Sequence, residues 1–263
     1  AKKFGTIDAV TKALKGREIV EFGGIEANPE FDTLAKAADL VKSENVDFLL
    51  AVGGGSVMDG TKFIALAAKM EAADYGSILT HGFAPVPAEE VVPLGCVVTL
   101  PATGSEANAF GVVTKDHHKL PFMCPLVYPT FSFLDPELTK TLPTKQIANG
   151  VTDAFVHVVE YYLTYPVNAK VQDRIAEGVL QTLIEDGPVT YKNNEDIEAR
   201  KNFIWSATNA LNGSIGAGTP GDFATHMIGH ELTALFGIDH GRTLAIVLPS
   251  LLRERKSQKQ QKL

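Results

Sequence analysis

Apolar and polar positions alternate along the first half of the chain in two different periods. Short continuous apolar runs, such as DFLLAV, are typical of strands that are covered on both faces. These runs predict strands over residues 18–22, 47–52, 95–100, 110–114 and 130–134. Apolar residues at helical spacing predict helices over residues 4–14, 31–41 and 57–70. Strands that alternate with helices indicate a parallel α/β sheet.

The second half has a helical pattern throughout. From about residue 143 the apolar positions recur every three or four residues, and strand-like alternation is almost lacking. Helices are expected roughly over residues 144–164, 168–186, 194–213, 221–236 and 240–252. The change of pattern at Asp135-Pro136 predicts an α/β domain over residues 1–135 and an all-α domain over residues 136–263.

Composition excludes several classes of protein. The formal net charge of −7 disfavours binding to the phosphates of a nucleic acid. No apolar run approaches the ~20 residues that span a membrane. Cys96 and Cys124 form no metal or redox motif, so we expect a reducing, cytoplasmic environment. Because the chain starts without Met in an expected helix and ends in a charged tail, we expect a fragment truncated at both ends.

Two motifs follow predicted strands. AVGGGSVMDGTK (51–62) joins a strand to a helix through three glycines and a serine, which suits a phosphate at the helix N-terminus. A tight turn without a ligand is the alternative, since the G-x-G-x-x-G spacing is absent. LPATGSEAN (100–108) places Thr103, Ser105 and Asn108, just after Thr99, where open α/β sheets bind ligands. A polar loop without a ligand is again the alternative.

Histidine spacing provides the most informative pattern. Asp153 and His157 are four residues apart, as are His226 and His230, so each pair shares one helix face. With His240, they form a plausible ligand set for zinc or iron(II). Glu160 and Glu231 are candidates for orienting a ligand imidazole, although exposed helix charges are the favoured interpretation. The remaining histidines, His81, His117 and His118, are expected in solvated loops.

Together these motifs resemble the iron-containing (group III) alcohol dehydrogenases. The similar runs are EFGGIEANP, LLAVGGGSVMDGTKFIA, TLPATGSEAN, LDPELTKTLP, NGVTDAFVHVVEYY and GDFATHMIGHELTALFGIDHGRTLAIVLP. Within that family the chain looks most similar to the branch of NADPH-dependent aldehyde reductases and butanol dehydrogenases. The resemblance implies a dehydroquinate synthase-like superfamily fold, with a dinucleotide-binding α/β domain, a helical domain and an active site between them.

Matching the motifs residue by residue implies a set of site residues. The family's metal ligands correspond to Asp153, His157, His226 and His240, and its proton-relay histidine to His230. The cofactor contacts correspond to Asn28, Gly54, Gly55, Ser56, Asp59, Thr99, Thr103, Asn108, Lys119, Leu138 and Thr141. The loop before Lys119 looks shorter than in near relatives.

The implied function is metal-dependent hydride transfer between NADP(H), or NAD(H), and a short-chain aldehyde or primary alcohol. The metal would be Fe²⁺ or Zn²⁺, and the family implies a homodimer. A dehydroquinate synthase-like or polyol-phosphate enzyme is an alternative, but Arg242 is an isolated basic residue near the predicted ligands. This scarcity of positive charge favours a small neutral substrate. A non-catalytic, metal-stabilised fragment is a third possibility.

Overall fold

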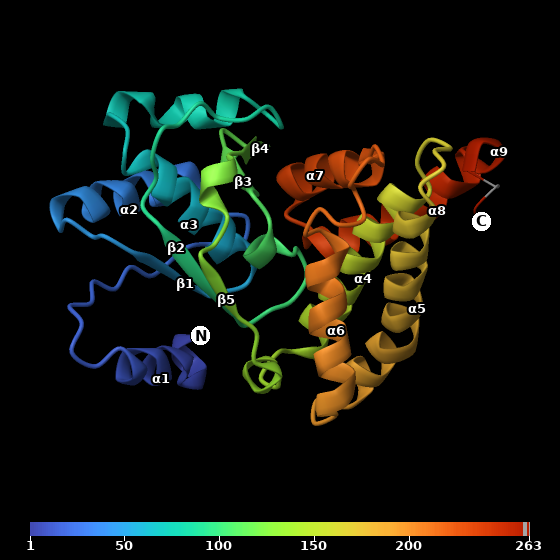
Figure 1. Cartoon of the computed structure of the whole chain (residues 1–263), viewed down its shortest axis with the longest axis horizontal. Coiled ribbons are helices and arrows are strands. Elements are labelled where there is room, and N and C mark those ends of the chain that lie inside the picture. Colours follow the sequence, from blue (N-terminus) through green and yellow to red (C-terminus); the bar gives the residue numbers. More distant parts are fainter. Residues whose placement is uncertain (260–261, 263) are drawn as a thin grey trace. The chain divides into compact units, whose positions relative to one another are not determined.

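A computed structural model describes residues 1–259 and 262 of the chain (Figure 1). The described chain divides into two compact units. The first comprises Ala1–Thr99 with Ser105–Leu138, and the second comprises Leu100–Gly104 with Thr139–Leu263. The division falls three residues after the predicted boundary at 135, and it assigns the short segment 100–104 to the helical unit. The predicted combination of an α/β part and a helical part is confirmed.

A parallel three-stranded sheet forms the centre of the first unit. Its order is β1 (Leu49–Gly53), β2 (Leu94–Val98) and β5 (Phe131–Phe133). The central strand β2 is buried at every position, as its continuous apolar run predicts. Helices α2 (Phe31–Ser43) and α3 (Gly55–Ala67) share one apolar cluster with β2. The same unit contains α1 (Thr6–Ala13) and the 3-10 helices η1 (Lys2–Phe4), η2 (Ala72–Thr80), η3 (Ser105–Ala107), η4 (Pro125–Val127) and η5 (Pro136–Thr139).

An antiparallel hairpin extends the first unit beyond the sequence prediction. Strand β3 (Phe110–Lys115) pairs with β4 (His118–Met123), a segment for which no strand was predicted. The two turn residues, Asp116 and His117, have φ values of 50° and 62°, which suit a two-residue hairpin turn. His117 and His118 are exposed, as predicted, although His118 lies on a strand. His81 is half-buried in a loop.

The strand predicted over residues 18–22 is wrong. The segment has no regular structure, and Ile19 and Val20 are 44% and 41% exposed. An apolar run forms a strand only where another strand accepts its backbone hydrogen bonds. Within the described residues, β1 pairs with β2 and not with this segment. The apolar pattern alone could not reveal that no described strand pairs with this segment.

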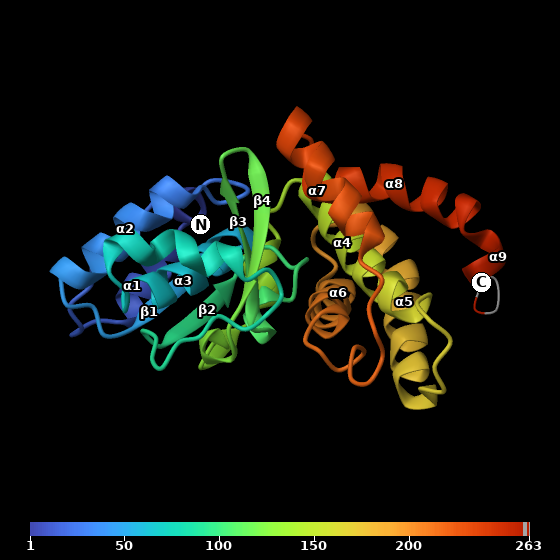
Figure 2. The ribbon, with the colours of Figure 1, turned by 90° about the horizontal axis from the view of Figure 1, so that it is seen from above.

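Helices make up the second unit (Figure 2). They are α4 (Thr144–Tyr162), α5 (Lys170–Lys192), α6 (Ile197–Ala210), α7 (Ala224–Phe236), α8 (His240–Glu254) and α9 (Lys256–Lys259). Helix α4 contributes to two apolar clusters, one with α5 and α6 and one with α8. Among the described helices, none combines the length and apolarity needed to cross a membrane.

Candidate functional site

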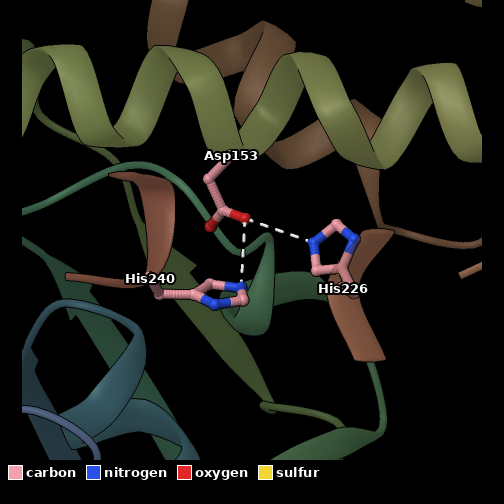
Figure 3. Close-up of side chains that lie close together, drawn as sticks. All are labelled: Asp153, His226 and His240. Carbon is pink, nitrogen blue, oxygen red and sulfur yellow. Dashed lines mark hydrogen bonds and ion pairs between the residues drawn. The ribbon is translucent and has the colours of Figure 1, made fainter. Parts of the chain in front are cut away.

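Four predicted ligands converge in the second unit. Asp153 and His157 lie one turn apart on α4, His226 lies on the first turn of α7, and His240 is the first residue of α8. The Oδ1 atom of Asp153 lies 3.4 Å from Nε2 of His226 and 3.7 Å from Nε2 of His240 (Figure 3). It also lies 3.7 Å from Nδ1 of His157. The structure therefore brings together all four predicted ligands.

Two glycines allow the three helices to approach closely enough for this convergence. A Cβ atom on Gly241 would lie 2.5 Å from the backbone oxygen of Asn149 on α4. A Cβ atom on Gly229 of α7 would lie 2.9 Å from Oγ1 of Thr243 on α8. Both spacings are shorter than a carbon atom tolerates. Glycine at 229 and 241 therefore lets α8 pack against α7 and α4, which places His240 beside Asp153.

The site is buried and favours positive charge. Asp153, His157 and His226 are each at most 5% exposed. Burial acts to raise the pKa of Asp153, but the three imidazoles and a hydrogen bond from His226 hold it well below its usual range. Burial lowers the pKa of His157 to about 4. Burial opposes the charge on His226 as well, yet its bonds to Asp153 and Glu160 raise its pKa to about 9. The carboxylates of Asp153 and Glu160 thus attract a cation to the site.

The donor set fits a divalent metal ion. Ligand atoms of Asp153, His226 and His240 all lie within 4.8 Å of one another. Nδ1 of His157 lies outside this group of three but 3.7 Å from Asp153; it is buried and has no hydrogen-bond partner among the described residues, which makes it the candidate fourth donor. One carboxylate with imidazole nitrogens is chemistry that suits both zinc and iron.

The interpretation of Glu160 as an exposed helix charge is wrong, because only 4% of the residue is accessible. Its Oε1 accepts a hydrogen bond of 2.6 Å from the N–H of Thr225, and its Oε2 contacts Nδ1 of His226. This contact directs Nε2 of His226 toward Asp153. Its spacing of seven from Asp153 is the sequence signal that places it on the ligand face. Glu231 is exposed, as predicted.

His230 lies beside this cluster, one helical turn after His226. It is 8% exposed, and its ring centroid lies 5.1 Å from that of His240 and 6.5 Å from that of His226. It is thus close enough to share a substrate with the cluster, while its proton-relay role stays a prediction.

A second group of predicted residues gathers in the first unit at the N-terminus of α3. The turn Gly53–Gly54–Gly55–Ser56 joins β1 to α3, and a Cβ atom on Gly53 would lie 2.6 Å from the Val57 side chain. Oγ of Ser56 accepts a hydrogen bond of 3.2 Å from the N–H of Asn28. Oδ1 of Asn28 in turn accepts one of 2.9 Å from Nζ of Lys119. Asn28, Ser56 and Lys119, separated by up to 91 residues, therefore lie together.

The remaining predicted cofactor contacts are placed differently. The N–H of Thr99 donates to the backbone oxygen of Gly53 at 2.9 Å, which places Thr99 next to the turn. The side chains of Asp59 and Asn108 belong to one hydrogen-bond network, which is only partly buried at Asp59. Thr103 and Thr141 lie in the second unit, whereas Leu138 ends the first. The centre of that network is Lys62, the last residue of the 51–62 motif, which was not among the predicted site residues.

Comparison with known proteins gives a family match for each of the two units. Residues 1–136 match the family described as iron-containing alcohol dehydrogenase. Residues 147–263 match the C-terminal part of the Fe-containing alcohol dehydrogenase family. The chain is 56% identical over 265 residues to the NADPH-dependent aldehyde reductase YqhD of Escherichia coli (strain K12), covering all of this chain and 68% of that protein. It is 43% identical over 268 residues to NADP-dependent alcohol dehydrogenase 3 of Entamoeba histolytica, with the same coverage.

Solved structures give the same relationship. The crystal structure of E. coli K-12 YqhD matches with a TM-score of 0.96 at 55% identity, over 99% of this chain and 67% of that one. NADH-dependent butanol dehydrogenase A from Thermotoga maritima matches with a TM-score of 0.91 at 36% identity, over 98% and 66%. The chain thus spans about two thirds of the length of these relatives. It belongs to the iron-containing alcohol dehydrogenase family.

Proposed function

We propose that this chain transfers a hydride between NADP(H) and a short-chain aldehyde or primary alcohol. The observation that carries the proposal is the convergence of a partly exposed His240 with the buried Asp153, His157 and His226 in a member of this family. Two relatives are named for NADPH or NADP, which supports NADP(H). Another is named for NADH, so NAD(H) is the alternative cofactor.

The chain's own residues have distinct roles in this proposal. A divalent metal, iron(II) from the family name or zinc from the donor set, would be held by Asp153, His157, His226 and His240. When bound, it supplies a Lewis acid for the oxygen of the aldehyde. Glu160 fixes the ring of His226 so that Nε2 faces the site. His230, 8% exposed beside His240, exchanges the proton of the substrate oxygen with solvent.

The turn at the start of α3 supports the binding of the dinucleotide. Gly54, Gly55 and Ser56 present a helix N-terminus, which favours the diphosphate. The ammonium of Lys119, held by Asn28, adds positive charge nearby. The proposed cofactor contacts further comprise Asp59, Thr99, Thr103, Asn108, Leu138 and Thr141. The proposal also includes a homodimer in the reducing cytoplasm, to which the free, buried state of both cysteines is suited.

Oxidation of NADPH and of NADH with butanal, with and without a chelator, tests the function. Chelator-sensitive turnover that prefers NADPH is expected. His226→Ala should lose both bound metal, measured by elemental analysis, and turnover. His118→Ala changes an exposed histidine of the first unit and is the matched control. Wild-type metal content and turnover in His226→Ala would refute the ligand assignment, and turnover insensitive to chelator would refute the metal's role.

A further inference from the structure

Helix α3 carries two charged side chains that face the rest of the unit, a half-buried Asp59 and a buried Lys62, three residues apart on one face. Lys62 has no exposed surface, and the five residues that follow it in the helix are apolar. A buried ammonium is costly unless each of its protons has an acceptor. The acceptors of Lys62 therefore indicate which parts of the fold it holds together.

All three protons of Lys62 are used within one neighbouring segment. Its Nζ donates to Oγ of Ser105 at 2.8 Å, to Oδ1 of Asn108 at 2.9 Å and to the backbone oxygen of Phe110 at 2.8 Å. An ammonium has three donors, so these three bonds satisfy it. Oδ1 of Asn108 also accepts the N–H of Phe110 at 3.2 Å, which folds the segment around the lysine.

Asp59 completes the connection one helical turn earlier. Oγ of Ser105 donates to its Oδ1 at 2.6 Å, and the N–H of Val112 donates to its Oδ2 at 3.0 Å. We call Asp59, Lys62, Ser105 and Asn108 the α3 lock. The lock ties α3 to residues 105–112, from η3 to the start of β3.

The two lock residues on α3, Asp59 and Lys62, lie one to two helical turns after the proposed diphosphate site. Lys62 follows Gly55, the first residue of α3, by seven positions, or about 10 Å along the helix axis. Its ammonium points to the 105–110 segment, so it does not itself bind the diphosphate. Two of the proposed cofactor contacts, Asp59 and Asn108, are lock members.

We propose that Lys62 is a positioning residue for the dinucleotide, because it fixes residues 105–112 against the helix that carries the phosphate-binding turn. This inference rests on the proposed function. It explains why α3 keeps a buried lysine at a position where an apolar residue would pack without desolvating a charge. It also gives Asp59 a bridging role, since its two oxygens accept hydrogen bonds from Ser105 and Val112.

Lys62→Met tests the inference, because methionine keeps the length of the side chain and removes all three donors. The measured quantities are the NADPH dissociation constant from nicotinamide fluorescence, KM and kcat with butanal, metal content and Tm. We expect Kd and KM for NADPH to rise about tenfold or more, with kcat at saturating NADPH changed by less than about threefold. Metal content should not change, since the metal ligands lie in the other unit.

Leu66→Ala is the matched control for simple destabilisation. Leu66 lies on the same helix, is 1% exposed and belongs to the apolar cluster. This variant should lower Tm at least as much as Lys62→Met while leaving the Kd for NADPH within about twofold of wild type. Ser105→Ala, which keeps the ammonium but removes the bridge to Asp59, is a second variant and should raise Kd about threefold.

Each outcome decides the proposal. A selective rise of Kd in Lys62→Met, or in Ser105→Ala if the methionine variant does not fold, supports it. An unchanged Kd in the folded variant, or an equal rise in Leu66→Ala, overturns it. If the wild-type chain itself binds no NADPH, the proposed function fails and the inference with it, a result separate from failure of the lysine variant alone.

Discussion

Replacing Glu160 by Gln should weaken metal binding although the ligands themselves are unchanged. The two oxygens of Glu160 face two donors, the N–H of Thr225 and Nδ1 of His226. A glutamine has one oxygen and one NH₂ group. The backbone N–H of Thr225 can only donate, so it takes the oxygen, and the NH₂ group then faces His226. The His226 ring must become an acceptor at Nδ1, which moves its proton to Nε2.

The magnitude follows from this change of tautomer. Nε2 of His226 is the atom 3.4 Å from Asp153, and once protonated it has no lone pair for a metal. Substitution of such an orienting partner typically lowers metal affinity about 10- to 100-fold, or about 1.4–2.7 kcal/mol. The effect on folding should be smaller, because glutamine keeps the volume and the bond to Thr225.

Competition with a chelator of known affinity measures the loss. The fraction of chain that retains Fe²⁺ or Zn²⁺ is determined by elemental analysis at several chelator concentrations. Glu231→Gln is the control, since Glu231 lies on the same helix as His226 but is exposed. Wild-type affinity in the Glu160→Gln variant would refute the tautomer argument. An equal loss in Glu231→Gln would show a nonspecific charge effect.

Four further predictions concern single residues. Gly241→Ala should reduce metal retention by at least about tenfold, because its Cβ atom would lie 2.5 Å from a backbone oxygen of α4 and displace His240; chelator competition tests this. His117→Val should lower the free energy of unfolding by about 1–2 kcal/mol in urea, whereas His117→Gly should not, because φ is 62°. Burial raises the pKa of Cys96 to about 12, so iodoacetamide at neutral pH should label it, by mass spectrometry, only after unfolding. Burial lowers the pKa of Lys62 to about 8, so between that pH and about 10.5 the unfolded chain binds more protons than the folded chain. The free energy of unfolding of the wild type should therefore rise by about 3 kcal/mol toward pH 10.5 relative to Lys62→Met. The same pH dependence of the unfolding free energy in both proteins would refute this.

Periodicity predicted most of the elements because burial makes the local pattern visible. The run LLAVG forms β1 and the run LGCVV forms β2, and helical spacing predicted α4 to α8 within a few residues, apart from a longer C-terminus of α5. The pairs at four-residue spacing placed the ligands on common faces, and the structure brings them together. The local pattern carries no information about which distant segments contact each other in the fold.

The missed features each depend on such a partner. Residues 18–22 are apolar enough for a strand but pair with no strand of the described sheet. Strand β4 contains Pro121 and polar residues, yet it forms because Asp116 and His117 accept positive φ and turn it back on β3. In both cases a long-range or turn-specific contact decided between strand and loop.

Buried ionisable residues are one feature of the sequence that indicates contacts between distant segments. Lys62 on α3, Glu160 on α4 and Arg200 on α6 are each at most 4% exposed within helices that carry apolar cores. Arg200 donates to the backbone oxygen and to Oγ1 of Thr139, both at 2.8 Å. Because a charge buried without partners is unstable, a charged residue on the apolar face of a helix predicts a specific polar contact there. A search of the sequence for charged residues on the apolar face of each predicted helix would have identified all three residues.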